Sequence, residues 1–170
     1  ADTTTRLFQV VPDEPFDVET HLVAEFEANS IVAGLVATSV EDVNWVTLKL
    51  WGHADGTAQL QYQTKENENG GGRVGAAPGF ASADGVVDLY MRLEKDTDNY
   101  TGSWKLAEGD DWTAIGPLEF PLTPPIELSL YAGVDGGFIG SLSPWGGDNA
   151  DALAGNFDGG YAAESDWFFQ

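Results

Sequence analysis

Apolar and polar residues alternate along most of the chain, and turn residues such as Asp55-Gly56 and Asp84-Gly85 separate the alternating stretches. This pattern predicts β-strands with one buried face, because successive side chains of a strand point to opposite sides of its sheet. The expected strands cover residues 6–10, 16–26, 30–38, 44–51, 57–65, 86–94, 100–106, 112–120, 126–134 and 162–169.

No stretch shows a convincing amphipathic helix, so the pattern favours an all-β protein built as an antiparallel β-sandwich or jelly roll. The chain has 170 residues, which is enough for one domain with a real core. No linker divides it, and a single module over residues 1–170 is expected. Two glycine-rich loops, residues 67–79 and 136–160, interrupt the strands. Long loops of this kind are often functional.

Charge and composition narrow the possible partners. The 28 Asp and Glu residues outnumber the 7 Lys and Arg residues, which gives a formal net charge of −21. Nucleic acid and anionic membrane surfaces are therefore unfavourable partners, since both require a basic surface. The absence of cysteine excludes disulfides, thiolate metal sites and cysteine nucleophiles. No apolar run is long enough for a membrane-spanning helix.

The acidity suits a secreted, salt-tolerant or calcium-binding protein. The chain begins with Ala1 rather than Met, as expected for a mature product or an excised module. We therefore expect a secreted, extracellular protein.

The strongest candidate for a binding surface is the strand expected over residues 44–51. Alternation turns its valine and leucines to the core and Trp45, Lys49 and Trp51 to the outer face. Indole rings stack on pyranose rings, while amide and guanidinium groups pair with sugar hydroxyls. If neighbouring strands share this sheet, the same face also carries Gln59, Gln61, His21, Tyr90 and Arg92. This mixed aromatic and polar surface predicts sugar binding.

Other aromatic residues have different expected roles. Trp145 lies among glycines in the long loop, where a sugar can approach the backbone closely, and it is a further ligand candidate. Tyr100, Trp104 and Trp112 are expected in the core. His53 lies in an expected turn and is interpreted as a solvated loop residue.

Seven motifs occur in order along the chain: Arg6-Leu-Phe-Gln-Val-Val, Phe16-Asp-Val-Glu-Thr, Val32-Ala-Gly-Leu-Val-Ala37, Asn44-Trp-Val-Thr-Leu-Lys49, Leu89-Tyr-Met-Arg-Leu93, Tyr100-Thr-Gly-Ser-Trp-Lys-Leu-Ala-Glu-Gly-Asp-Asp-Trp112 and Ala163-Glu-Ser-Asp-Trp-Phe-Phe169. In this order they resemble the concanavalin-like (laminin-G-like) β-sandwich module at the C-terminus of bacterial β-xylosidases and related bacterial families. The resemblance implies an antiparallel jelly roll that serves as an accessory module of a carbohydrate-active enzyme. It does not imply catalysis by the module.

The resemblance also implies a structural calcium ion that ties the chain ends to the sandwich. The matching positions here are Asp17, Glu19 and Asp166. Calcium takes six to eight oxygen ligands, mainly from carboxylates and carbonyls. No Asp-x-Asp-x-Asp-Gly loop is present.

These observations favour a noncatalytic carbohydrate-binding module that binds a polysaccharide or oligosaccharide and is joined to a catalytic domain of a parent polypeptide. Two alternatives remain open. One is a lyase or glycoside hydrolase on the same fold, although the Glu-x-Asp-x-Glu pattern common in such hydrolases is missing. The other is an interaction module that packs on a partner catalytic domain.

Overall fold

The computed structural model describes residues 5–25, 31–41, 44–53, 55, 57–65, 79–81, 86–134 and 163–169. Every regular element in these ranges is a strand, and none of these residues forms a helix that is long and apolar enough to cross a membrane. The strands are β1 (Thr5–Val11), β2 (Phe16–Glu25), β3 (Ile31–Ser39), β4 (Trp45–Gly52), β5 (Thr57–Lys65), β6 (Gly79–Ala81), β7 (Val86–Asp96), β8 (Asn99–Lys105), β9 (Thr113–Glu119), β10 (Ile126–Val134) and β11 (Ala163–Phe169).

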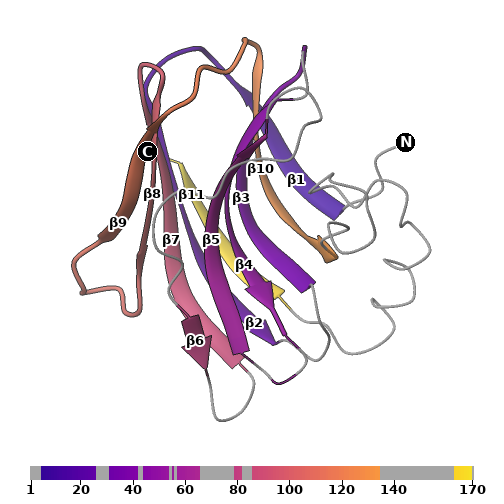
Figure 1. The fold of residues 1–170 in the computed structure, drawn as a ribbon, viewed down its shortest axis with the longest axis vertical. Coiled ribbons are helices and arrows are strands. Elements are labelled where there is room, and N and C mark those ends of the chain that lie inside the picture. Colours follow the sequence, from indigo (N-terminus) through magenta and orange to yellow (C-terminus); the bar gives the residue numbers. More distant parts are fainter. Residues whose placement is uncertain are drawn as a thin grey trace.

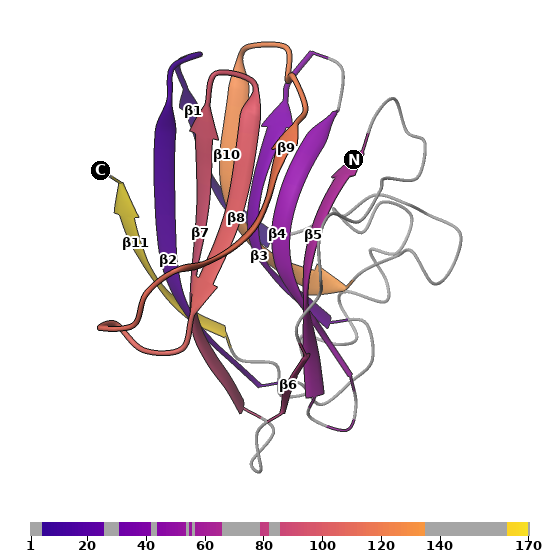
Figure 2. The same ribbon diagram turned by 60° about the vertical axis from the view of Figure 1, so that its left-hand side comes forward.

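The strands form two antiparallel sheets that face each other (Figures 1 and 2). Sheet A has the order β1-β10-β3-β4-β5-β6, and sheet B has the order β11-β2-β7-β8-β9. β10 lies between β1 and β3, and β11 lies beside β2, so late strands complete sheets begun by early ones. The all-β sandwich predicted from the alternation is therefore confirmed.

The inner faces of the two sheets form the main core. Alternate residues of β4 and β5, including Leu48 and Leu60, pack with Leu22, Leu89 and Met91 from sheet B, and all five are at most 1% exposed. Burial of these aliphatic side chains removes apolar surface from water and is the main force that holds the sheets together.

Two tyrosines, Tyr62 and Tyr100, are enclosed in this core. Neither hydroxyl has a hydrogen-bond partner within the described part of the chain. Burial raises the pKa of both hydroxyls, and the carboxylates of Asp13 and Asp98 raise that of Tyr100 further. Ionisation of either tyrosine is therefore much harder in the folded chain than in the unfolded chain.

We expect alkaline pH to destabilise the fold through these two residues. The unfolded chain releases tyrosine protons near pH 10, whereas the folded chain retains them, so their stabilising effect is complete below pH 10 and is lost as the pH rises. Raising the pH from 9 to 10.5 should lower the free energy of unfolding by about 1–2 kcal/mol, measured by urea titration. Replacing Tyr62 and Tyr100 together with phenylalanine should remove most of this dependence. A double variant with the wild-type pH profile would contradict the assignment.

Candidate functional site

The outer face of sheet A carries the residues proposed to bind a ligand on β4. Trp45, Thr47, Lys49 and Trp51 share this face, while the intervening residues of β4 point into the main core. The assignment of faces by alternation is confirmed. β5 adds two amides, because Gln59 pairs in register with Trp51, and Gln61 pairs with Lys49.

Trp45 is buried in a second apolar cluster on this outer face. The outer cluster consists of Val32, Val36, Trp45 and Tyr131, and Trp51 packs partly buried at its margin. Only 5% of Trp45 is exposed. The expectation that both indoles of β4 stand exposed is therefore wrong for Trp45, because apolar residues of β3 and β10 surround it.

The side chains at the centre of the outer face are mostly polar, and they are buried. Thr47 Oγ1 donates to the Leu35 carbonyl oxygen at 2.8 Å, and the Tyr131 hydroxyl lies 2.9 Å from the same Oγ1, where it donates in turn. Lys49 and Gln61, both expected to contact a ligand, are 2% and 1% exposed. Neither side chain is therefore accessible enough to contact a ligand directly.

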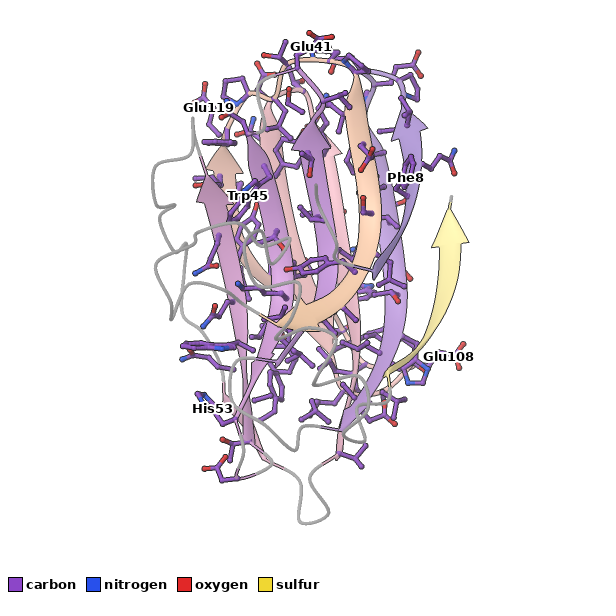
Figure 3. All side chains as sticks on the ribbon, turned by 90° about the vertical axis from the view of Figure 1, so that its right-hand side faces the viewer. Phe8, Glu41, Trp45, His53, Glu108 and Glu119 are labelled. Carbon is purple, nitrogen blue, oxygen red and sulfur yellow. The ribbon has the colours of Figure 1, made fainter. Side chains whose placement is uncertain are left out.

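The accessible part of this face is its Trp51 end. Trp51 is half-buried, and the His53 ring lies 5.3 Å from it between centroids, at an interplanar angle of 44°. Beside the indole, Gln61 Nε2 donates to Gln59 Oε1 at 3.2 Å. Figure 3 shows Trp45 and His53 towards opposite ends of the sheet. The arrangement therefore places one partly open indole next to an ordered pair of amides.

The turn between β4 and β5 holds His53 in place. The His53 amide donates to the Thr57 carbonyl oxygen at 2.8 Å. Asp55 Oδ1 accepts from the Thr57 hydroxyl at 2.6 Å and from its amide at 3.0 Å. These hydrogen bonds lower the pKa of the Asp55 carboxyl group. His53 is half-buried against Trp51, so its interpretation as a simple solvated residue is wrong.

Three of the other proposed ligand-binding residues lie on the opposite layer. His21 belongs to β2, and Tyr90 and Arg92 belong to β7, so all three are on the outer face of sheet B. The His21 ring stacks on the Tyr90 ring, with centroids 4.2 Å apart and planes 7° from parallel. His21 Nε2 also lies 2.7 Å from Asp88 Oδ1. The expected single surface is therefore two surfaces, because β4 and β7 belong to different sheets.

Two residues that the sequence analysis did not assign to a site join this second surface. The Trp112 ring lies 4.6 Å from Lys105 Nζ and 4.6 Å from Arg92 Cζ, measured to the ring centroid. Trp112 is half-buried rather than in the core, so its expected core position is wrong. Ile115, three residues later, points into the core. In an extended strand, a residue three positions before Ile115 points to the opposite face. The outward position of Trp112 could therefore have been predicted from the sequence.

The expected calcium ligands lie on two paired strands of sheet B, Asp17 and Glu19 on β2 and Asp166 on β11. Asp17 and Glu19 lie two residues apart on β2, and Glu19 Oε1 lies 3.7 Å from Arg92 Nη1. Asp166 pairs with His21 through its backbone, and its side chain lies outside the described atoms. Within the described residues, no group of three or more His, Asp or Glu side chains gathers as a metal site. Calcium binding by Asp17, Glu19 and Asp166 stays a prediction, because the described side chains do not include that of Asp166. Trp145 lies outside the described residues.

Comparisons with known proteins bear on this geometry. The family model of the β-xylosidase C-terminal concanavalin A-like domain matches residues 2–142. No curated protein matches the chain. Among solved structures, a xylan β-1,4-xylosidase from Bacillus halodurans C-125 superposes with a TM-score of 0.55 at 16% identity, over 69% of this chain and 24% of the xylosidase.

Two other structures share the fold. A functionally unknown protein from Saccharomyces cerevisiae matches with a TM-score of 0.54 at 13% identity, over 76% of this chain and 63% of the yeast protein. A scytalido-glutamic peptidase matches with a TM-score of 0.51 at 10% identity, over 79% of this chain and 65% of the peptidase. The chain thus spans less than two thirds of the yeast protein and about a quarter of the xylosidase.

Proposed function

The chain belongs to the family of C-terminal concanavalin A-like domains of β-xylosidases, and on that premise we propose that it is a noncatalytic carbohydrate-binding module of a secreted carbohydrate-active enzyme. Its ligand is a neutral polysaccharide, with xylan the first candidate because a structural neighbour is named for that substrate. Secretion belongs to the proposal because a polymeric ligand of this kind is met outside the cell.

The observation that carries the proposal is the half-buried Trp51 beside Gln59. A partly exposed indole on a sheet offers a flat apolar surface, and large exposed aromatic groups often mark binding sites. The His53 ring at 5.3 Å leans over the same end of the strand. A sugar ring that covers the indole would meet both groups, and His53 would limit its orientation.

The amide pair supplies directional contacts. Gln61 is buried and donates to Gln59 Oε1, which fixes the orientation of the Gln59 amide group. Gln59 Nε2 then has two N–H donors for the oxygen atoms of sugar hydroxyls. Pre-organised donors of this kind reduce the entropy lost on binding. Gln59 is consequently the residue that selects hydroxyl geometry in this proposal, and Gln61 positions it.

A second function, docking onto a partner catalytic domain, is favoured by strand β1. Phe8 and Val10 are 53% and 54% exposed on this edge strand of sheet A. Exposed apolar side chains on an edge strand are typical of surfaces covered by another protein domain. Docking through β1 and glycan binding at Trp51 use separate parts of sheet A, so one module can do both.

Affinity electrophoresis tests the binding function. The whole chain should migrate more slowly in native gels that contain neutral xylan than in gels without it, with a dissociation constant in the range of about micromolar to millimolar. Reducing ends should not accumulate. Unchanged migration across a panel of neutral polysaccharides would overturn the proposal in favour of docking alone, and released sugar would overturn its noncatalytic part.

A further inference from the structure

The outer face of sheet B holds an unusual group of side chains around Trp112, which we call the Trp112 cluster: Trp112, Lys105, Arg92 and Tyr90. Lys105 ends β8 and pairs in register with Tyr90 on β7. The loop after β8 returns over this face (Figure 2) and brings Trp112 against Lys105 and Arg92. The cluster thus gathers two of the seven Lys and Arg residues of the chain on one indole.

The two cations of the cluster differ in their charge balance. Arg92 Nη2 lies 3.1 Å from Glu94 Oε2, and Arg92 Nη1 lies 3.7 Å from Glu19 Oε1, so two carboxylates balance its charge. Lys105 makes no ion pair with any carboxylate of the described residues. Its Nζ donates to the Glu108 carbonyl oxygen at 2.6 Å. An ammonium group without a carboxylate is unexpected in a chain with 28 Asp and Glu residues.

Lys105 is also held in a fixed place. Its Nζ lies 4.6 Å from the Trp112 ring centroid and 5.4 Å from the Tyr90 ring centroid. Cation–π contacts and one backbone acceptor orient the ammonium group and leave its other donors to solvent, since Lys105 is only half-buried. By contrast, Lys95 is buried, and Asp13 binds its Nζ at 2.8 Å. Lys105 is therefore a pre-positioned cation, whereas Lys95 is a structural one.

We propose that the Trp112 cluster is a second ligand site, which binds the carboxylate of a uronic acid side group on an acidic polysaccharide. Lys105 Nζ supplies the charge-assisted hydrogen bond to the carboxylate. The edges of the Trp112 and Tyr90 rings give apolar contact to the sugar ring. The site faces away from Trp51, on the other layer of the sandwich. It goes beyond the neutral-glycan function and does not depend on it.

A matched pair of ligands tests this site: xylan that carries glucuronic acid side groups, and the same polymer after chemical reduction of its carboxylates to alcohols. The wild-type chain should bind the acidic polymer roughly three- to fivefold more tightly than the reduced polymer, as expected for one partly exposed ion pair. Added salt should reduce this preference by screening. Affinity electrophoresis in both polymers gives the ratio directly.

Three variants assign the preference to Lys105. Lys105→Gln should bind both polymers equally, and Lys105→Arg, which keeps the charge, should retain the preference for the acidic polymer. Glu108→Gln is the matched control, because Lys105 contacts only the backbone carbonyl of Glu108, and it should behave as the wild type or prefer the acidic polymer more. A melting curve for each variant checks that it folds. If Lys105→Gln does not fold, the preference for the acidic polymer in the wild type and in Lys105→Arg decides the test.

The outcomes distinguish a failure of the proposed site at the Trp112 cluster, called here the uronate site, from a failure of the Trp51 site. Equal binding of both polymers by the wild type, or a preference kept by folded Lys105→Gln, overturns the uronate site and leaves the Trp51 site standing. Binding of the acidic polymer alone supports the uronate site and overturns the Trp51 site. Binding of neither polymer overturns both.

Discussion

Replacing Trp45 with alanine is expected to lower the free energy of unfolding by about 3–5 kcal/mol, the range for removal of a large aromatic side chain from a packed interior. Trp45 is 5% exposed and packs with Val32, Val36 and Tyr131 in the outer cluster. The neighbouring strands carry these contacts, and a cavity left by the indole cannot close without moving the sheet. The loss is measured by urea unfolding at neutral pH.

Trp51→Ala is the matched control, because the same residue type lies on the same face of the same strand. Trp51 is half-buried at the margin of the outer cluster, so its removal should destabilise the fold much less than Trp45→Ala. The comparison separates a structural indole from an accessible one. Equal unfolding midpoints for Trp45→Ala and the wild type would contradict the packing of the outer cluster.

The strands were largely predictable because alternation is a local signal. Each expected strand occurs with ends within two residues of those predicted, and β6 alone was missed. β6 spans only three residues, Gly79–Ala81, too few to show a period of two. Alternation also assigned Trp45 and Trp51 to one outer face correctly. The local alternation of apolar and polar residues therefore predicts where the strands lie and to which face each side chain points. It does so because successive side chains of a strand point to opposite sides of the sheet.

The site was less predictable because it depends on pairing between distant segments. β4 and β5 are consecutive and pair as a hairpin, which brings Gln59 to Trp51. β7 pairs with β2 and β8 instead, and no local feature of Tyr90 or Arg92 reveals their sheet. Burial of Trp45 has the same origin, since its neighbours come from β3 and β10. The site could not be predicted fully because the residues that form it, or that bury Trp45, lie far apart in the sequence.

The position of Trp112 outside the core could have been predicted from the sequence. Its place after the turn at residues 108–111 and its alternation with Ile115 both put it outside the core. The expected core position follows the general tendency of aromatic residues to be buried. Two cations stabilise its exposed position through cation–π contacts.

Loss of glycan affinity in Trp51→Ala is the second large effect that we expect. A sugar ring that covers about 60 Å² of apolar indole surface gains about 1.5 kcal/mol, which corresponds to about a tenfold change in the dissociation constant. Gln59→Ala should weaken binding by a smaller factor, because a net hydrogen bond contributes about 1 kcal/mol. Leu106→Ala serves as the surface control. Leu106 is 54% exposed and directly follows β8 of sheet B, whereas Trp51 belongs to sheet A. Figure 3 shows Glu108, two residues further along the chain, on the other side of the sandwich from His53.

Isothermal titration of neutral xylo-oligosaccharides into the folded wild type, Trp51→Ala and Leu106→Ala is the most direct test of glycan binding on sheet A. We predict saturable binding by the wild type and Leu106→Ala, and a dissociation constant at least about tenfold higher for Trp51→Ala. An unchanged affinity in folded Trp51→Ala would contradict the assignment of the ligand to this end of β4.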